Sequence, residues 1–100
     1  MDLKYLFEWN PEKAKSNAIK HKVKFEQAAS IFRDPNAISI YDEEHSESED
    51  RWITIGIAYN SQLLVVIHTY EKINEFSVEI RVISARKATK NETEIYNGDL

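Results

Sequence analysis

Two stretches in the first third of the sequence carry small or apolar residues at the spacing of an α-helix. Asn10-Pro11-Glu12 supplies an N-cap, a first-turn proline and a first-turn acid, so a helix is expected from there to about His21. A second helix is expected from Phe25 and must stop at Asp34-Pro35, because the residue before a proline avoids the helical region. The positions that share one face at i, i+3, i+4 and i+7 are Ala14, Asn17, Ala18 and His21, then Phe25, Ala28, Ala29 and Phe32.

After Pro35 the apolar period changes to two, which is typical of β-strands. Strands are expected at residues 37–42 and 52–57, and the run at 63–67 should be the central strand because both of its faces are apolar. Residues 73–75 are expected to form a loop before the last strand. In that strand Phe76, Val78, Ile80 and Val82 should face the core, and Ser77, Glu79, Arg81, Ile83 and Ala85 should face the other way.

The end of the sequence predicts a third helix. Thr89-Lys90-Asn91-Glu92 is a capping box, so a helix that carries Ile95 and Tyr96 is expected from about Lys90 until Asn97-Gly98 ends it. The run from Tyr5 to Trp9 has strand-like residues and could add a short N-terminal strand. We therefore expect one α+β domain over residues 1–100, with a four-stranded antiparallel meander sheet, two N-terminal helices and one C-terminal helix.

Composition excludes several classes of protein. One hundred residues with 42% hydrophobic content can bury one core, and there is no cysteine for a disulfide or a thiolate zinc site. The longest apolar run is five residues, far below the roughly 20 needed to cross a bilayer, so a cytoplasmic location without a membrane is expected. Without a phosphate-binding glycine loop, a serine elbow or a His-x-x-x-His pair, no cofactor or metal is expected. His45, Glu49 and Asp42 could bind a metal, but carboxylates in a hydrophilic loop are more simply explained as solvated.

The net charge of −4 conceals two basic segments. Residues 13–24 contain five lysines and no acid, and residues 81–90 contain two arginines, two lysines and no acid. Six carboxylates in residues 42–50 more than cancel either segment in the total. Either basic segment could be a solvated face, but both also have the charge that a phosphate-binding surface requires.

The end of the last expected strand holds the most informative polar side chains. Arg81, Ser84, Arg86 and Lys87 are concentrated there, and Arg81 is expected on the sheet face opposite to that of Val82. Arginine forms two-pronged hydrogen bonds to phosphate, and it can stabilise the extra negative charge of the phosphorane formed during RNA cleavage.

Four other polar residues have both a chemical and a structural interpretation. His68 follows the apolar central strand and could act as a general acid or base near neutral pH, or be a structural histidine. Tyr96 could stack on a base or donate a proton, or pack half-buried beside Ile95. Arg51 and Glu49 could belong to a site or could simply pair across a turn.

Several short blocks, spread over nearly the whole length, match the pattern of one known family. The most specific is the strand end Arg81-Val82-Ile83-Ser84-Ala85-Arg86-Lys87-Ala88, followed by Glu92 and Tyr96. The other blocks are Phe7-Glu8-Trp9 with Lys13 and Asn17, then Lys20-His21, Val23-x-Phe25-Glu26, Asp34-Pro35, Asp42-x-x-His45-Ser46 with Glu49-x-Arg51, and Leu64-Val65-Val66 with Thr69. On these blocks the sequence resembles the BrnT family of type II toxins, a RelE-like ribonuclease group. It departs from the family pattern at Lys22, where glycine usually follows Lys-His, and at Asn10, which replaces an aspartate.

The resemblance implies a RelE-like fold and a metal-independent endoribonuclease that cleaves RNA and inhibits translation. It also implies a BrnA-type antitoxin whose ribbon-helix-helix domain binds DNA. Operator DNA would then be bound only through the complex, in which the toxin could be a dimer.

Under this hypothesis the 2′-hydroxyl of RNA attacks the adjacent phosphate and leaves a 2′,3′-cyclic end. Arg81 and Arg86, with support from Arg51 and Lys87, would hold the phosphate and stabilise its transition state. His68 is the first candidate for the acid or base, with Glu49 or His45 as substitutes. The candidate catalytic residues are Arg81, Arg86, His68, Arg51 and Glu49, and the candidate RNA-binding residues are Lys87, Lys20, His21, Tyr96 and Ser84.

The competing hypothesis is a non-catalytic binding module, or a degenerate toxin that acts as an antitoxin-dependent co-repressor. It is favoured by the lack of a recognisable acid-base pair in the sequence. Cleavage of RNA by the lone chain would discriminate between the two.

Overall fold

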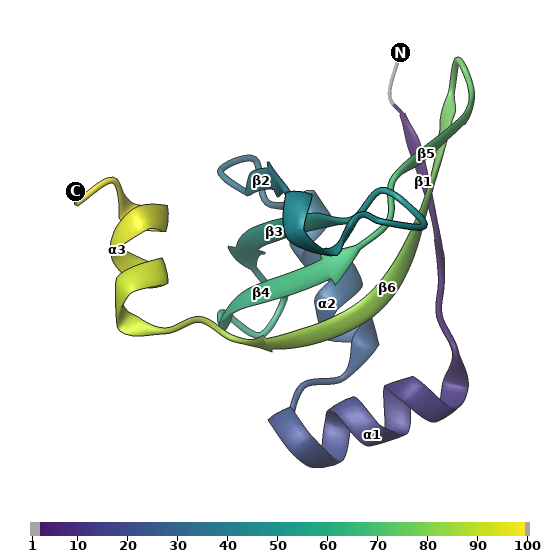
Figure 1. The fold of residues 1–100 in the computed structure, drawn as a ribbon. Helices are drawn as coiled ribbons and strands as arrows, with labels where there is room; N and C mark the ends of the chain where they lie inside the picture. The colour runs from purple at the N-terminus through teal and green to yellow at the C-terminus, as the bar shows by residue number, and fades with distance from the viewer. Residues whose placement is uncertain (1–2, 100) are drawn as a thin grey trace.

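The computed structural model describes residues 3–99 and consists of a strongly twisted mixed sheet with helices on both of its faces (Figure 1). Helices α1 and α2 follow the first strand, and α3 is attached to the end of the last strand (Figure 1). The strands within these residues are β1 (Lys4–Glu8), β2 (Ile38–Tyr41), β3 (Trp52–Ile57), β4 (Leu63–His68), β5 (Glu71–Asn74) and β6 (Ser77–Lys87), and the helices are α1 (Pro11–His21), α2 (Phe25–Ser30) and α3 (Lys90–Asn97), with 3-10 turns η1 (Ile31–Arg33) and η2 (Glu43–His45).

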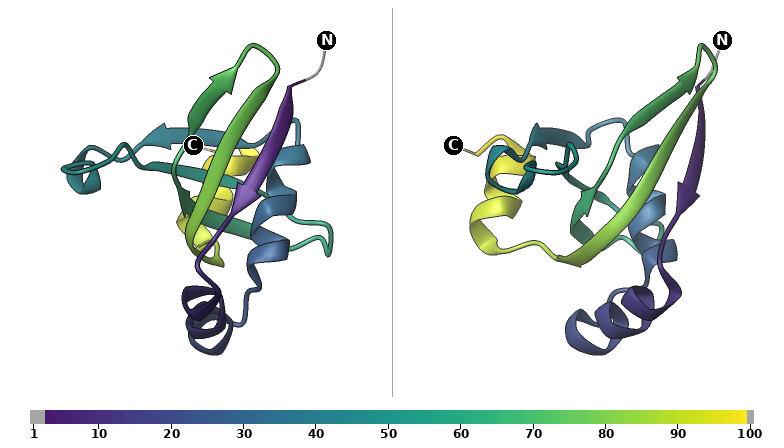
Figure 2. Two further views of the ribbon diagram at one scale, coloured as in Figure 1. Left: turned by 90° about the vertical axis from the view of Figure 1, so that its right-hand side faces the viewer. Right: turned by 45° about the vertical axis from the view of Figure 1, so that its right-hand side comes forward.

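The sheet contains the predicted antiparallel meander of β2, β3, β4 and β6, with β4 in its interior. Two short strands extend it. Strand β1 lies parallel to the first half of β6, and β5 pairs antiparallel with the other edge of that half. The three form a ribbon that projects from the molecule, as does the η2 segment between β2 and β3 (Figure 2).

The prediction of a loop at residues 73–75 is wrong, because Ile73 and Asn74 belong to β5. The chain turns instead at Glu75 and Phe76. Phe76, which the alternation assigns to the core, lies at this exposed turn with 49% of its surface accessible.

The hydrophobic core lies between α2 and one face of the sheet. Phe25, Ala28 and Ile31 project from α2 and η1 onto Leu64 and other residues of β4 and β6, and all of them are fully or almost fully buried. Gly56 in β3 allows η1 to approach closely, because an added Cβ would lie 3.1 Å from the Cβ of Ile31. The buried members of this cluster are Val23, Phe25, Ala28, Ile31, Ala58, Leu64, Val66, Val82 and Ala85.

A β-bulge in β6 changes which side chains face the core. Ile67 pairs with Ser84 whereas His68 pairs with Val82, so β6 contains one extra residue at this point. The predicted outward position of Ala85 is therefore wrong: it is buried beside Val82. After the bulge Ser84 and Arg86 face away from the α2 core, as Arg81 does before it.

Asn17 fixes α1 against β6 beside this bulge. Its side-chain amide donates to the carbonyl oxygens of Val23 at 3.0 Å and Ala85 at 2.8 Å, and its Oδ1 accepts from the backbone N–H of Ala85 at 3.1 Å. Asn17 is buried, with 7% of its surface accessible. The three hydrogen bonds satisfy one backbone group in the loop after α1 and two in β6 beyond the end of its pairing with β1, and they tie α1 to the end of β6.

The two ends of α1 differ in strain. Asn10 is the predicted N-cap, and its Oδ1 accepts from the backbone N–H groups of Glu12 and Lys13. At the other end Lys22 has a positive φ of 59°, a left-handed conformation that favours glycine.

No helix in residues 3–99 has the length and apolar character that crossing a bilayer would require.

Candidate functional site

A cationic groove runs between α1 and the middle of β6. Its first part has a volume of about 360 Å³, and an adjoining hollow of about 220 Å³ continues along α1. The two share Lys13 and Ile83, so they form one continuous surface. The first part is lined by Asn10, Lys13, Glu49, Arg51, Arg81, Val82 and Ile83, and the second by Lys13, Ser16, Asn17, Lys20, His21, Ile83 and Ser84.

At the centre of the groove Glu49 lies between two arginines. Its Oε1 accepts a close hydrogen bond from Nη2 of Arg81, and Nη2 of Arg51 lies 3.6 Å from the same oxygen. All three side chains keep about a third of their surface accessible, at 33% for Glu49, 39% for Arg81 and 32% for Arg51. The hydrogen bond from Arg81 is the main cause that holds the pKa of Glu49 below its ordinary value, so the carboxylate is ionised at neutral pH.

Arg51 retains unused hydrogen-bonding capacity in this cluster. Its Nε is buried, and within residues 3–99 it has no hydrogen-bond partner. Because a buried donor without a partner is costly, an acceptor that reached this atom would be favourably bound. The residues that face one another here come from three separate segments, namely α1, the end of the η2 loop and β6.

Arg86 and Lys87 lie beyond the groove, near α3. Arg86 donates to both carboxylate oxygens of Glu92, at 2.7 and 2.9 Å, in a two-pronged pair. The pair lowers the pKa of Glu92 to about 2 and raises the pKa of Arg86. Lys87 is exposed. The pair ties the first turn of α3 to β6, and neither cation lines the groove.

His68 lies on the opposite face of the sheet, in the core. It is 2% accessible, its ring packs edge-on against Phe32 at 4.8 Å, and burial lowers its pKa. Both ring nitrogens have partners: Nδ1 donates to the carbonyl oxygen of Thr69 at 2.9 Å, and Nε2 lies 2.6 Å from Oγ1 of Thr54. The structure therefore does not bring His68 together with Arg81.

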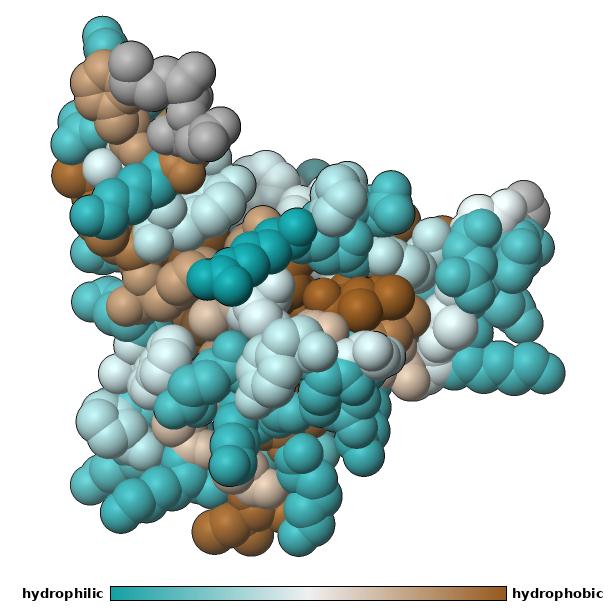
Figure 3. Space-filling view, turned by 180° about the vertical axis from the view of Figure 1, so that it is seen from behind, coloured by the Kyte–Doolittle hydropathy of each residue, from teal (hydrophilic) through white to brown (hydrophobic). Residues whose placement is uncertain are grey.

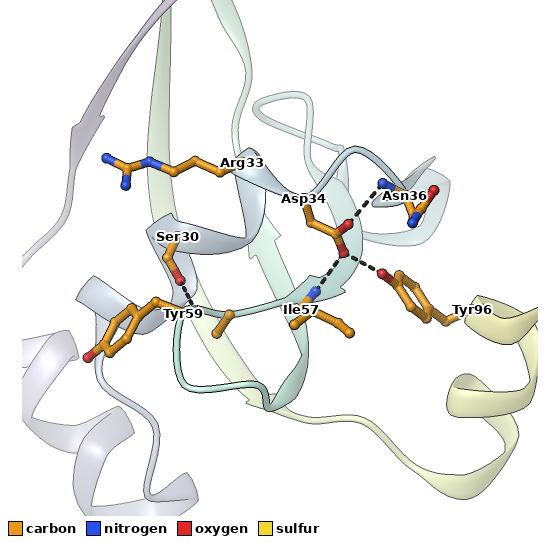
Figure 4. A pocket seen from close by; sticks show the side chains of 8 residues that line it. Ser30, Arg33, Asp34, Asn36, Ile57, Tyr59 and Tyr96 are labelled. Carbon is orange, nitrogen blue, oxygen red and sulfur yellow. Dashed lines mark hydrogen bonds between the residues drawn. The ribbon is translucent and has the colours of Figure 1, made fainter.

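Tyr96 is also far from the groove, in a pocket between α3 and the η1 corner (Figure 4). Its hydroxyl donates to Oδ2 of Asp34, which also accepts from the backbone N–H of Ile57, while Oδ1 accepts from that of Asn36 (Figure 4). Burial would raise the pKa of Asp34, but these hydrogen bonds outweigh it and lower the pKa. The same contact raises the pKa of Tyr96. Tyr96 thus fastens the C-terminal helix to the body.

Of the ten predicted site residues, the structure gathers Arg81, Arg51, Glu49, Lys20, His21 and Ser84 in the groove. Four polar residues that line the groove were not predicted as site residues, namely Asn10, Lys13, Ser16 and Asn17. The sequence carried a signal for Lys13, because it opens the acid-free segment at residues 13–24. It carried none for Asn10 beyond its role as a helix cap.

The described residues contain no group of three or more His, Asp or Glu side chains placed to hold a metal ion. The exposed His45 pairs with the largely covered Asp42, with Nδ1 3.0 Å from Oδ2. Glu49 is instead held by the two arginines.

Comparison with known proteins gives the family. The sequence model of the family described as "Ribonuclease toxin, BrnT, of type II toxin-antitoxin system" matches residues 9–92. No curated protein matches the chain at a significant level. Among solved structures, the Brucella abortus ribonuclease toxin BrnT superposes with a TM-score of 0.56 at 20% sequence identity, over 86% of this chain and 97% of that one. At this identity the likeness establishes the fold, and it agrees with the α+β architecture described above. Because the family model covers most of the chain, this protein belongs to the BrnT family of ribonuclease toxins of type II toxin-antitoxin systems.

Proposed function

We propose that this chain is an endoribonuclease whose active site is the cationic groove between α1 and β6. One observation carries the proposal: Glu49, an ionised proton acceptor, lies in the same groove as Arg51 and Arg81. The description of the family as ribonuclease toxins supports the reaction class. The groove supports its location, because it is the surface where the two basic segments of the sequence meet.

The groove has the charge to bind an RNA strand. Lys13 and Lys20 from α1 and Arg81 from β6 contribute permanent positive charges along its length, and Arg51 adds a fourth. A phosphate that enters displaces the carboxylate of Glu49 from direct contact with Arg81 and takes its place between the two guanidinium groups. The Nη2 atoms of Arg81 and Arg51, which now lie near Glu49, then have anionic oxygens to bind.

The reaction is an attack of the 2′-hydroxyl on the neighbouring phosphorus. Glu49 accepts the hydroxyl proton, the 2′-oxygen forms a bond to phosphorus, and the bond to the 5′-oxygen breaks. Lys13 or water returns a proton to that oxygen. Arg81 and Arg51 stabilise the additional negative charge of the phosphorane, a contribution that for one such donor is worth about 10²-fold or more in rate. The product is a 2′,3′-cyclic phosphate, and the reaction requires no metal ion.

We assign Glu49 rather than His68 as the base. Glu49 lines the groove, whereas His68 is buried on the other sheet face with both ring nitrogens occupied. Arg86 and Tyr96 are assigned to the attachment of α3, and Lys87, Lys20, His21 and Ser84 to contacts with flanking RNA.

In the cell this activity inhibits translation, and an antitoxin neutralises it. Membership of a type II toxin-antitoxin family supports an antitoxin partner. We propose that the partner is of the BrnA type, with a ribbon-helix-helix domain through which the complex, with this chain as a dimer, binds operator DNA.

A non-catalytic role has one observation in its favour. The guanidinium groups of Arg81 and Arg86 are both engaged with carboxylates, those of Glu49 and Glu92, as in a purely structural network. A chain of this kind would serve as a partner for the antitoxin and cleave nothing.

Inducible expression of the lone chain separates the two functions. Expression of the wild type should stop growth and the incorporation of labelled amino acids, and Arg81→Ala should do neither. Arg33→Ala is the matched control, because Arg33 is an exposed arginine outside the groove. Continued growth with wild-type chain present in folded form would favour the non-catalytic role.

A further inference from the structure

A second cavity lies on the α2 side of the sheet, away from the cationic groove. It has a volume of about 210 Å³, and its lining is mostly aromatic. Hydrophobic surface gathers on this side of the molecule beside the projecting ribbon (Figure 3). The cavity is smaller than the roughly 300–1,000 Å³ of pockets for small-molecule ligands, so it suits a single side chain. Its lining residues are Tyr5, Phe32, Ser39, Trp52, His68 and Tyr70, which we call the aromatic pocket.

Aromatic rings in this pocket are held by contacts with neighbouring rings, and two of them are only partly covered. Tyr5 and Tyr70 remain 39% and 45% accessible. The ring of Phe32 is held by its edge-on contact with the buried His68 ring. Trp52 is held by a similar edge-on contact with Tyr41, with the ring centroids 5.2 Å apart. An inserted aromatic ring would find edges and faces fixed at the spacing that such pairs prefer.

A chain of hydrogen bonds sets the polarity of the pocket wall. Because the carbonyl oxygen of Thr69 can only accept, Nδ1 of His68 carries the proton, and Nε2 of the neutral ring accepts from Oγ1 of Thr54. Oγ1 of Thr54 has then used its one proton, so the 2.8 Å contact with Ser39 is a hydrogen bond donated by Ser39. Ser39 lines the pocket and its Oγ is left with acceptor capacity only, so a ligand that reaches this atom must offer it a donor.

The surroundings of the pocket are acidic. Tyr70 also lines a neighbouring cavity of about 240 Å³ that contains five carboxylates and one guanidinium, that of Arg81. Asp50 of that cavity accepts a hydrogen bond from the hydroxyl of Tyr41 at 2.8 Å, and the ring of Tyr41 contacts Trp52 of the aromatic pocket. The carboxylates of this acidic wall belong to Glu8, Glu49, Asp50, Glu71 and Glu79. Such a wall repels phosphates and attracts a basic polypeptide.

We propose that the aromatic pocket binds a tyrosine side chain carried on a basic segment of a partner protein. The ring fills the aromatic cavity, its hydroxyl donates to Ser39, and flanking lysines or arginines contact the acidic wall. The identification of this partner as the antitoxin rests on the proposed function. The aromatic pocket shares no lining residue with the cationic groove, but the acidic wall shares Glu49 with it and also borders Arg81, so a basic segment on this wall would reach the edge of the groove.

The test uses the two tryptophans as reporters. In ¹⁵N-labelled protein, Trp52 reports on the pocket, and Trp9, which packs against the buried Phe25 at 5.9 Å, reports on an unrelated place. The probes are three short peptides, acetyl-Lys-Arg-Tyr-Lys-Arg-amide, its Phe analogue and an analogue with four acids in place of the basic residues. Titration of the basic Tyr peptide should shift the indole N–H signal of Trp52 and leave that of Trp9 in place. The Phe analogue should bind roughly three- to tenfold more weakly, the loss expected for one hydrogen bond, and the acidic analogue should not bind.

Two variants complete the design. Ser39→Ala should bind the Tyr and Phe peptides equally, because the acceptor has been removed, and Tyr70→Ala should weaken both. Tyr70→Ala should cleave RNA as the wild type does, so a failure of the ribonuclease function and a failure of this proposal can be told apart. No shift of Trp52 at millimolar peptide, an equal shift with the acidic analogue, a shift of Trp52 by a single-stranded RNA, or a persistent Tyr preference in Ser39→Ala would overturn the proposal.

Discussion

Replacement of Glu49 by glutamine should change RNA binding and RNA cleavage in opposite directions. The groove contains four permanent cations, Lys13, Lys20, Arg51 and Arg81, and one carboxylate. Glu49→Gln removes the negative charge that is paired with Arg81 and Arg51, so the net charge of the groove rises from +3 to +4. Binding to a single strand should become tighter, while loss of the general base should reduce the cleavage rate by about 10²- to 10⁴-fold.

The magnitude of the binding effect follows from counterion release. With a slope of about −0.7 per neutralised phosphate on a single strand, log Kd should depend on log salt with a slope of about 2.1 for the wild type and about 2.8 for Glu49→Gln. Between 50 and 200 mM salt, the affinity should fall roughly 20-fold in the first case and roughly 50-fold in the second.

The assay pairs fluorescence anisotropy on a 2′-O-methyl oligonucleotide, which cannot react, with single-turnover cleavage of the unmodified strand. Glu47→Gln is the matched control, because Glu47 is an exposed carboxylate of the same loop that does not line the groove. It should leave both measurements unchanged. Weaker RNA binding by Glu49→Gln than by the wild type, or equally fast cleavage, would contradict the role assigned to Glu49.

Three further predictions concern the scaffold of the groove. Asn17→Ala should lower the free energy of unfolding, measured in urea, by about 2–4 kcal/mol, because it leaves the N–H and C=O of Ala85 unsatisfied. A loss below about 1 kcal/mol would contradict the role given to the Asn17 amide. Lys22→Gly should raise the free energy of unfolding by about 0.5–1 kcal/mol, or Tm by several degrees, because glycine adopts the positive φ without strain. Lys22→Ala should not raise it, and equal effects of the two substitutions would show that Lys22 is not strained. The pKa of Glu92 is depressed from 4.5 to about 2, so its contribution is present above pH 4.5 and is lost as pH falls toward 2. Solvent screening of the partly exposed Arg86 limits this contribution to about 1 kcal/mol. Denaturation curves of Glu92→Gln should lack this part of the pH dependence, and an unchanged profile would contradict the assignment.

The local elements could be predicted from the sequence because their signals are local. The cap at Asn10, the stop at Asp34-Pro35 and the capping box at Thr89 act within one helical turn, and each lies where it was expected. The alternating strands likewise gave the antiparallel meander. These features depend on the spacing of neighbouring residues and on nothing farther along the chain.

The bulge in β6 could not be predicted, and it determines which side chains the groove contains. Simple alternation placed Ala85 and Arg81 on one face, but the extra residue reverses the alternation and buries Ala85. The bulge is supported by Asn17, 68 residues away in sequence, through hydrogen bonds that no local pattern encodes. An asparagine on the small-residue face of a helix was visible in the sequence, but its partner was not.

The composition of the site was predicted in part for the same reason. Arg81 was expected to be accessible because it alternates with buried residues, and it is. Its pairing with Glu49 joins segments 32 residues apart, and it depends on how the acidic loop folds back toward the sheet. His68 was visible as a histidine at a strand end, but its burial beneath Phe32 depends on the packing of η1.

We propose above that RNA cleavage takes place in the groove at Arg81. It is tested most directly by cleavage of a short single-stranded RNA by purified wild-type chain and by Arg81→Ala, both in EDTA and both checked for folding. We expect the wild type to produce ends with a 2′,3′-cyclic phosphate and the variant to be slower by about 10²-fold or more. A folded Arg81→Ala protein that cleaves at the wild-type rate would contradict it.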